Sequence, residues 1–235
     1  MSDMTVISEN DLIESVADAL QYISYYHPMD YIRALGDAYE AEKGPAAKDA
    51  IAQILTNSRM CAEGHRPICQ DTGIVTVFVN IGMDVKFECD MALDDVINEG
   101  VRRAYNLPEN VLRASILADP AGKRANTKDN TPAVIHYQIV PGDKVEIDVA
   151  AKGGGSENKS KMVMLNPSDS IVDWVIKTVP TMGAGWCPPG MLGIGIGGTA
   201  EKAMLKTTWD PSTCVETTLG RSSRSASNTC PARAT

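Results

Sequence analysis

The sequence lacks an excess of positive charge, a long apolar run and an N-terminal secretory signal. Its formal net charge is −8 over 235 residues, so neither nucleic acid nor an anionic membrane is expected as a partner. No apolar run is long enough to span a bilayer, and the first fifteen residues are polar and acidic. We therefore expect a cytoplasmic protein, whose six cysteines are thiols or metal ligands rather than disulfides.

Two further patterns are missing. The sequence has no internal repeat, and it has no Cys-x-x-Cys pair, so spacing does not indicate a tetrahedral zinc site. Hydrophobic residues make up 43% and charged residues 22% of the chain, as in ordinary globular proteins. The length allows one large domain or two small ones.

Hydrophobic periodicity predicts a mixed α/β fold, with N-terminal helices followed by a mixed sheet and further helices. Ser8 and Asp90 are expected to cap helices, and three glycines make 152–159 a loop. A helix beginning at Asn166-Pro167 is expected to bury its apolar side chains, Ile171, Val172, Val175 and Val179. The predicted helices are 9–23, 28–43, 45–63, 91–105, 167–179 and 199–205, and the predicted strands are 74–81, 133–140 and 144–151, the last two forming a hairpin around Pro141-Gly142-Asp143.

The composition changes after Lys206. Of the 29 residues in 207–235, 12 are Ser or Thr, and no apolar period survives there. Such a segment cannot bury enough apolar surface to order itself. We therefore expect one domain over residues 1–206, incomplete by itself, and a disordered or non-native tail over 207–235.

Two cysteines lie in predicted loops whose flanking proline and glycine residues are expected to restrict the backbone. Cys69 lies in Arg66-Pro67-Ile68-Cys69-Gln70-Asp71-Thr72-Gly73, and Cys187 lies between Trp186 and Pro188-Pro189. A cysteine followed directly by proline is also a ligand of some ferredoxin-type clusters. We interpret Cys69 and Cys187 as meeting in space on an iron–sulfur cluster, whereas Cys61 and Cys89 are structural.

Three motifs have alternative interpretations. Asp71-Thr72-Gly73 is similar to the active loop of aspartic proteases, but those need two such loops and one is present. Gly153–Ser160 is close to a phosphate-binding P-loop, with Asn158 where its second glycine belongs. The glycines of 193–198 match a dinucleotide fingerprint without the strand that must precede it. A nucleotide-binding module built on Gly153–Ser160 therefore remains an alternative.

Four stretches together resemble class I fumarases, the iron–sulfur hydro-lyases related to the α part of L-tartrate dehydratase, over about residues 10 to 206. The stretches are Ile68–Gly73, Asn126-Thr127, Ala151–Lys159 and Cys187-Pro188-Pro189. The resemblance implies fumarate hydratase activity, the reversible hydration of fumarate to malate in the tricarboxylic acid cycle. It also implies a [4Fe-4S] cluster with one open iron that acts as a Lewis acid.

The same resemblance assigns roles to individual residues. Cys69 and Cys187 would be cluster ligands, and Asp71 would be catalytic, handling a proton at the substrate hydroxyl. The residues that would bind the substrate carboxylates are Gln70, Arg113, Gly153 and Gly154. The family's third cluster cysteine lies downstream, in a region without a counterpart in this chain.

The resemblance also implies partners. We expect a small dicarboxylate substrate, fumarate or malate, and either a homodimer or a complement from a C-terminal domain or β chain. The alternative is a tartrate dehydratase-like α chain that acts only with a partner subunit. On either interpretation, this chain alone is expected to be inactive and to hold no stable cluster.

Overall fold

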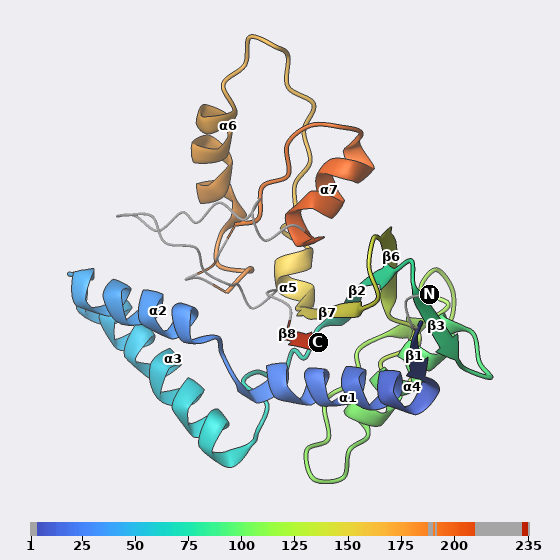
Figure 1. Ribbon diagram of the computed structural model, residues 1–235. Coiled ribbons are helices and arrows are strands. Elements are labelled where there is room, and N and C mark those ends of the chain that lie inside the picture. Colours follow the sequence, from blue (N-terminus) through green and yellow to red (C-terminus); the bar gives the residue numbers. More distant parts are fainter. Residues whose placement is uncertain (1–3, 188–189, 191, 210–231, 235) are drawn as a thin grey trace.

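The computed structural model describes residues 4–187, 190, 192–209 and 232–234. The architecture is mixed α/β, as the sequence predicts: long N-terminal helices, a mixed sheet and a lobe that carries the last helices (Figure 1). Among the described residues, no helix is long and apolar enough to cross a membrane.

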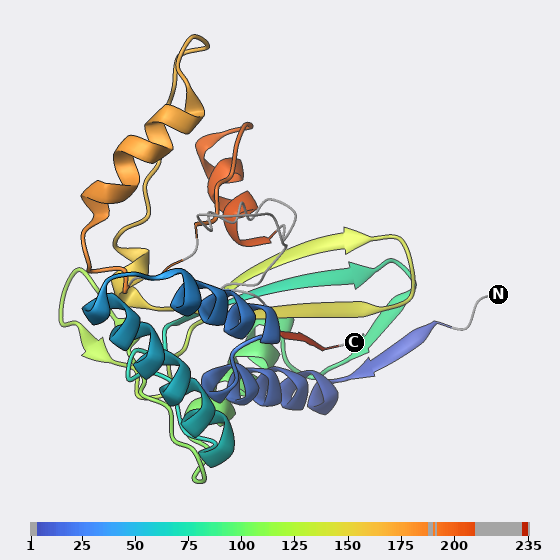
Figure 2. The same ribbon diagram turned by 90° about the vertical axis from the view of Figure 1, so that its left-hand side faces the viewer.

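The first helix, α1 (Glu9–Tyr25), begins where the sequence predicts. The Ser8 hydroxyl caps it by accepting the N–H of Asp11 at 3.2 Å. Together with α4 (Leu93–Tyr105), α1 covers one face of the central sheet (Figures 1 and 2). The core between them is built from buried aliphatic side chains, which include Leu12, Val16, Leu20, Val75, Val77, Val96, Val101 and Val149.

The predicted cap of α4 is wrong. Ala92 stands at the N-cap and no side chain caps the helix there. The N–H groups of Asp90 and Met91 instead donate to Oε2 of Glu9, at 2.9 and 3.1 Å. The chain that leads into α4 is thus held by the first turn of α1, which a reading of local sequence does not reveal.

Two further helices, α2 (Met29–Ala41) and α3 (Pro45–Gly64), pack together beside the main core (Figures 1 and 2). Both lie within two residues of their predicted bounds. Their contact forms a second, smaller core of Tyr31, Leu35 and Ile51.

The central sheet has the strand order β6-β2-β7-β8. Strand β2 runs parallel to β6 and antiparallel to β7. The strands are β2 (Ile74–Gly82), β6 (Val134–Val140), β7 (Val145–Lys152) and β8 (Ala232–Ala234).

The predicted hairpin between β6 and β7 is wrong, because β2 lies between these strands. The end of β2 passes under the turn that joins them: the N–H of Gly82 donates to Lys144 O at 2.8 Å. A Cβ on Gly82 would stand 2.4 Å from Gly142 O, so only glycine allows this passage. The turn residues 141–143 therefore join strands that are not neighbours.

Two small sheets complete the body. Strand β1 (Thr5–Ser8) pairs in parallel with β3 (Val85–Glu88). Strand β4 (Leu117–Ala118) pairs antiparallel with β5 (Ala125–Asn126). None of these four short strands is predicted from the sequence.

A lobe follows the sheet and carries α5 (Gly154–Glu157), α6 (Ile171–Thr178), the 3-10 helix η1 (Val179–Met182) and α7 (Ala200–Trp209). The Thr199 hydroxyl caps α7 by accepting the N–H of Lys202 at 3.2 Å. Helix α6 begins four residues later than predicted, with Ser170 as its cap.

The predicted burial of the α6 side chains is wrong. Ile171 and Val172 are 42% and 65% exposed, and Val175 and Val179 are only partly buried. Periodicity identified an apolar face correctly, but nothing in the described structure covers it.

Most of the predicted tail, 207–235, lies outside the described residues. The described parts continue α7 to Trp209 and place β8 beside β7. The domain boundary at Lys206 stays a prediction.

Candidate functional site

The loop between α3 and β2 carries the first predicted ligand, Cys69, and two helices hold it. The N–H of Ile68 donates to the carbonyl of Ser24, on α1, at 2.8 Å. The side-chain amide of Asn57, on α3, donates to Ile68 O at 3.0 Å. The position of Cys69 therefore depends on packed helices and not on the loop alone.

Cys69 presents an exposed thiol. Its Sγ accepts the N–H of Asp71 at 3.4 Å and donates to Oε1 of Gln70 at 3.3 Å. Hydrogen bonds to cysteine sulfur also occur in iron–sulfur proteins, where they tune the cluster. Burial raises the pKa of the Cys61 and Cys89 thiols, which keeps them protonated in their structural positions.

The Asp71 carboxylate lies against the start of α5. A Cβ built on Gly153 would stand 3.1 Å from Asp71 Oδ2, and one on Gly154 would stand 4.0 Å away. The absence of a side chain at Gly153 lets the carboxylate approach the backbone, whereas a Cβ on Gly154 would make only an ordinary van der Waals contact with it. The structure thus brings the predicted catalytic residue together with two of the predicted substrate-binding residues.

Gly73 fixes the other end of the Cys69 loop against β7. Its φ is +83°, and a Cβ there would stand 2.7 Å from the carbonyl carbon of Ala151 and 2.8 Å from the backbone of Lys152. Both the left-handed conformation and the close approach require glycine. The loop is therefore locked to the strand that leads directly into α5.

Residues Gly154–Glu157 form the helical turn α5, whereas their glycines predict a loop. Neighbouring side chains close the turn. Lys152 Nζ lies 3.3 Å from Glu157 Oε2, and the Ser156 hydroxyl donates to Gly153 O at 3.0 Å. These contacts offset the low helix preference of glycine.

The turn that leads to Cys187 packs on α5. A Cβ on Gly155 would stand 2.7 Å from Gly185 O, two residues before Cys187. Cys187 is exposed and adopts a φ of 61°. Three segments that are distant in sequence therefore meet at α5: the Cys69 loop, the glycines 153–155 and the turn before Cys187.

The donor chemistry of this region fits part of an iron–sulfur site. Cys69 and Cys187 are both exposed thiols, and both lie on segments that contact α5. Thiolates are the ligands that iron–sulfur clusters use. Within the part of the chain that the structure describes, no three His, Cys, Asp or Glu residues gather as a metal site. The shared cluster, with Cys69 and Cys187 as two of its ligands, stays a prediction.

Arg113 lies beside the Cys69 loop. The Thr72 hydroxyl donates to the backbone carbonyl of Arg113 at 2.5 Å. The Arg113 side chain is exposed, and among the described residues no carboxylate forms an ion pair with it. Its guanidinium therefore remains available for an anionic ligand, as its predicted role requires.

Two buried residues that the sequence analysis missed, Asn130 and Tyr105, hold the backbone of the Cys69 loop through hydrogen bonds. Asn130 is 0% exposed: its Nδ2 donates to Gly73 O at 3.0 Å, and its Oδ1 accepts the N–H of Ser115 at 2.8 Å. The Tyr105 hydroxyl donates to Thr72 O at 2.9 Å. Burial raises the pKa of Tyr105 to about 12. Local sequence carries little signal for either role, because both act on backbone carbonyls far away in the chain.

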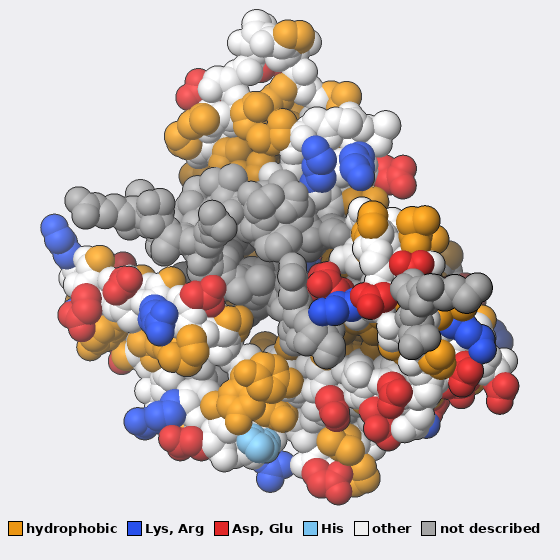
Figure 3. Space-filling view, viewed as in Figure 1, with side chains coloured by type: hydrophobic (Ala, Val, Ile, Leu, Met, Phe, Trp, Pro, Cys, Tyr) orange, Lys and Arg blue, Asp and Glu red, His pale blue; other side chains and the backbone are white. Residues whose placement is uncertain are grey.

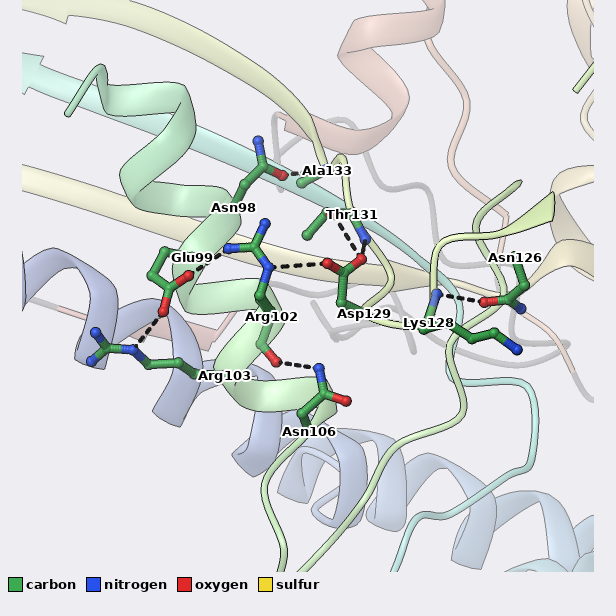
Figure 4. Close-up of polar contacts among 10 residues, drawn as sticks. All are labelled: Asn98, Glu99, Arg102, Arg103, Asn106, Asn126, Lys128, Asp129, Thr131 and Ala133. Carbon is green, nitrogen blue, oxygen red and sulfur yellow. Dashed lines mark hydrogen bonds and ion pairs between the residues drawn. The ribbon is translucent and has the colours of Figure 1, made fainter. Parts of the chain in front are cut away.

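An ion-pair network holds the segment that carries Asn130 against α4 (Figure 4). Arg102 Nε donates to Asp129 Oδ2 at 3.0 Å, and Arg102 also pairs with Glu99. The hydrogen bond from Arg103 is the main cause that lowers the pKa of Glu99. The network thus ties the support of the Cys69 loop to the main core.

Comparison with known proteins relates most of the chain to one family. The sequence model of the family described as "Fumarate hydratase (Fumerase)" matches residues 13–218. The chain is 34% identical, over 195 residues, to the "Putative L(+)-tartrate dehydratase subunit alpha" of Methanocaldococcus jannaschii. That alignment covers 80% of this chain and 68% of the relative.

Two bacterial relatives have similar names. The L(+)-tartrate dehydratase subunit alpha of Escherichia coli strain UTI89 is 30% identical over 200 residues, which cover 83% of this chain and 65% of the relative. The protein of the same name from strain K12 is 28% identical over 199 residues, with the same coverage. The chain therefore spans about two thirds of the length of these relatives.

Proposed function

The chain belongs to the fumarate hydratase family, and from that premise we propose that it is the α component of an iron–sulfur hydro-lyase. The observation that carries the proposal is the meeting of three segments at α5. There the Asp71 carboxylate lies against the glycine-lined backbone, and the Asp71 N–H donates to the exposed Cys69 thiol. A hydro-lyase that removes or adds water beside a carboxylate needs these groups in one place.

Two residues of this chain, Cys69 and Cys187, would hold the cluster. A bound cluster would supply a Lewis acid for the hydroxyl group of the substrate. The N–H of Asp71 would remain directed at Cys69 Sγ after the thiol loses its proton, and would fix that ligand. The third ligand would come from outside the described residues.

The side chains around the cysteines would bind and orient the substrate. Arg113 would pair with one substrate carboxylate, and the amide of Gln70 would donate a hydrogen bond to it. Gly153 and Gly154 would let the substrate approach the backbone closely. The Asp71 carboxylate, held against Gly153, would accept or return the proton at the substrate hydroxyl.

We propose tartrate, or a similar hydroxy-dicarboxylate, as the substrate in preference to fumarate. The names of the relatives favour the tartrate dehydratase-like α chain over the fumarate hydratase that the motifs first indicated. An α chain of that kind acts with a partner subunit. A β-type chain is therefore the partner that we propose.

A hybrid enzyme tests the proposal. Residues 13–206 of this chain would replace the matched stretch of the Escherichia coli K12 relative, expressed anaerobically with the partner subunits of that enzyme. We expect iron incorporation and faster turnover of L(+)-tartrate than of malate or fumarate. Cys69→Ser and Cys187→Ser should each lower both iron content and turnover, whereas Cys61→Ser should change neither. A hybrid that holds iron and turns over none of these acids would contradict the proposal.

A further inference from the structure

A cavity of about 810 Å³ lies between the C-terminal half of α1, the residue that ends α3 and the loop that follows α4. This volume is in the range of pockets that bind small molecules. Its floor is rigid, because the buried side chains of Gln21 and Asn110 are bonded to each other: Asn110 Nδ2 donates to Gln21 Oε1 at 2.8 Å. Its described lining includes none of the residues assigned to the candidate site. We call it the α1 cavity.

Aromatic rings form one wall of the α1 cavity. Tyr22 and Tyr25 both line it, with ring centroids 6.4 Å apart and planes tilted by 59°. The ring of His65, which also lines it, stacks on Tyr25 at 4.6 Å. Tyr26 packs against both tyrosines, at 4.7 and 4.8 Å, and its hydroxyl lies 3.2 Å from His65 Nε2. The four rings therefore hold one another in place, and Tyr22 stays 53% exposed.

The space-filling view shows this wall from outside. Hydrophobic side chains, among which tyrosine is counted, gather beside a histidine where α1 meets the end of α3 (Figure 3). Leu107, in the loop after α4, also lines the cavity and is 38% exposed. The cavity thus offers aromatic and aliphatic surface that the described part of the chain leaves uncovered.

Two carboxylates complete the lining, and no lysine or arginine is among the described lining residues. Asp18 lies one turn before Tyr22 on α1, and Glu109 lies in the loop after α4. Among the described residues, neither carboxylate forms an ion pair. Burial, and then the neighbouring Tyr26 and Asp18, raise the pKa of Tyr25. The cavity is therefore negative, in a chain whose net charge is −8.

This lining favours an organic cation over other ligands. The face of an aromatic ring attracts a cation that lies within about 6 Å of its centroid, and alkylated ammonium groups also pack well on apolar surface. An anion, such as the dicarboxylate that we propose as substrate, would be repelled by Asp18 and Glu109. A metal ion needs several ligand atoms close together, and in the described part of the chain no three His, Cys, Asp or Glu residues gather in that way.

We propose that the α1 cavity binds a small organic cation of the quaternary ammonium type. Its charged head would lie against Tyr22 and Tyr25, close to Asp18, and its apolar part would contact Leu107. A whole small molecule fits this volume, whereas a single lysine or arginine side chain from a partner protein would leave most of it empty. The site is independent of the proposed reaction and of the cluster.

Binding would also affect the loop that carries Cys69. His65 stands at the start of that loop, and the carbonyl of Ser24, next to Tyr25, accepts the N–H of Ile68 at 2.8 Å. A cation held between the rings of Tyr25 and His65 on one side and Asp18 on the other would strengthen the contact between α1 and the loop. Hydrogen exchange at Ile68 should therefore become slower in the bound state.

A pair of probes with the same shape tests the charge requirement without any activity measurement. The chain would be titrated by calorimetry with choline and with 3,3-dimethylbutan-1-ol, in which a carbon atom replaces the charged nitrogen. We expect one choline per chain, bound at least tenfold more tightly than the alcohol. Hydrogen exchange with choline present should be slowed in 15–25, 65–68 and 107–110.

Matched variants locate the site. Tyr22→Leu removes a ring but keeps an apolar side chain, and Asp18→Asn removes a charge but keeps the shape. Each should weaken choline binding roughly threefold or more, and both side chains are exposed, so the fold should survive. Tyr137→Leu is the control: this tyrosine is 40% exposed and bonds a carboxylate, that of Asp94, outside the cavity.

Four outcomes would overturn the proposal. These are no saturable binding of choline, equal affinity for choline and the alcohol, the same loss of affinity in Tyr137→Leu as in Tyr22→Leu, and a dimer of this chain that Tyr22→Leu dissociates. The last outcome would show that a second protein chain fills the cavity.

Discussion

The Asp71 carboxylate occupies the space that a side chain on Gly153 would need, with only 3.1 Å between Oδ2 and the position of a Cβ. Gly153 itself has an ordinary extended conformation, φ −62° and ψ 141°, which alanine also adopts. Position 153 therefore needs glycine because of the nearby Asp71 carboxylate, and not because of the backbone conformation at that position.

Gly153→Ala should separate stability from activity. We expect the free energy of unfolding to change by less than about 1 kcal/mol, because the end of the Asp71 side chain can move a few tenths of an ångström. In the hybrid enzyme the displaced carboxylate should lower turnover by roughly ten- to a hundredfold. Denaturant titration and steady-state kinetics measure the two effects. Gly36→Ala is the control, since nothing lies within 4 Å of its Cβ, and unchanged kinetics for both variants would refute the role of Gly153.

Asn130→Ala should be strongly destabilising. It removes both hydrogen bonds of a fully buried amide, which leaves Gly73 O and Ser115 N without those partners. We expect a loss of about 2–4 kcal/mol in the free energy of unfolding. Chemical denaturation measures it, with Asn106→Ala as an exposed asparagine for comparison. A loss no greater than that of the control would show that the two hydrogen bonds do not hold the loop.

Tyr105 should give the protein an alkaline stability limit. Its pKa is raised to about 12 by burial, so the folded state keeps the phenol protonated where the unfolded chain, with a pKa near 10, releases the proton. The resulting stability is fully present below pH ~10 and is lost as pH rises towards ~12.

Tyr105→Phe should reduce the alkaline loss, to which Tyr31 and Tyr137 also contribute because burial raises their pKa values too. It should also cost about 1 kcal/mol at neutral pH, through the missing hydrogen bond to Thr72 O. Thermal unfolding from pH 8 to 12 measures both effects. Tyr22→Phe, at a tyrosine that is 53% exposed, should retain the alkaline loss of the parent. Identical pH profiles for Tyr105→Phe and the parent would contradict the assignment.

Arg113→Ala should weaken transition-state binding in the hybrid enzyme by about 2–4 kcal/mol, because a substrate carboxylate would lose its ionic partner. The ratio kcat/KM measures this loss. Arg103→Ala is the control, since the guanidinium of Arg103 pairs with Glu99 on α4. Kinetics within twofold of the parent would identify Arg113 as a surface charge.

This chain by itself should have no hydratase or dehydratase activity and should hold no stable cluster. Only two motif cysteines are available, and Cys214 and Cys230 stand in a Ser- and Thr-rich segment without apolar periodicity. Fixing such a segment around a metal would cost roughly 1–2 kcal/mol per residue. Anaerobic reconstitution with iron and sulfide measures iron content and turnover. About four irons per chain together with turnover would refute the prediction.

The sequence predicted most helices and strands well, but it did not predict which of them lie side by side in the fold. Ser8 and Pro45 mark helix starts through backbone chemistry that acts within one turn, so they could be read directly. The order of β6, β2 and β7 depends on where a third strand inserts, and the turn residues of 141–143 contain no information about that insertion. The exposed face of α6 was misread for a similar reason, because periodicity identifies an apolar face without saying what covers it.

The candidate site was predicted only where its residues share a motif. Cys69, Gln70 and Asp71 are consecutive in sequence, whereas the contact of Asp71 with Gly153 is known only from the structure. Asn130 and Tyr105 were missed because their hydrogen bonds reach carbonyls more than 30 residues away. Nothing in their immediate sequence distinguishes them from an ordinary loop amide and an ordinary core tyrosine.

The passage of Gly82 under the turn between β6 and β7 affects how the chain folds. Because β6 and β7 are not neighbours, the sheet cannot start from a short-range hairpin. Even the pairs that lie nearest in sequence, such as Thr76 with Val134 and Ile81 with Val145, are far apart, so long loops must close before any of these strands gains a partner. Sheets built from such distant pairs fold slowly. Until β2 is in place, β6 and β7 expose unpaired edges, and newly made chains would be most prone to aggregate during that interval.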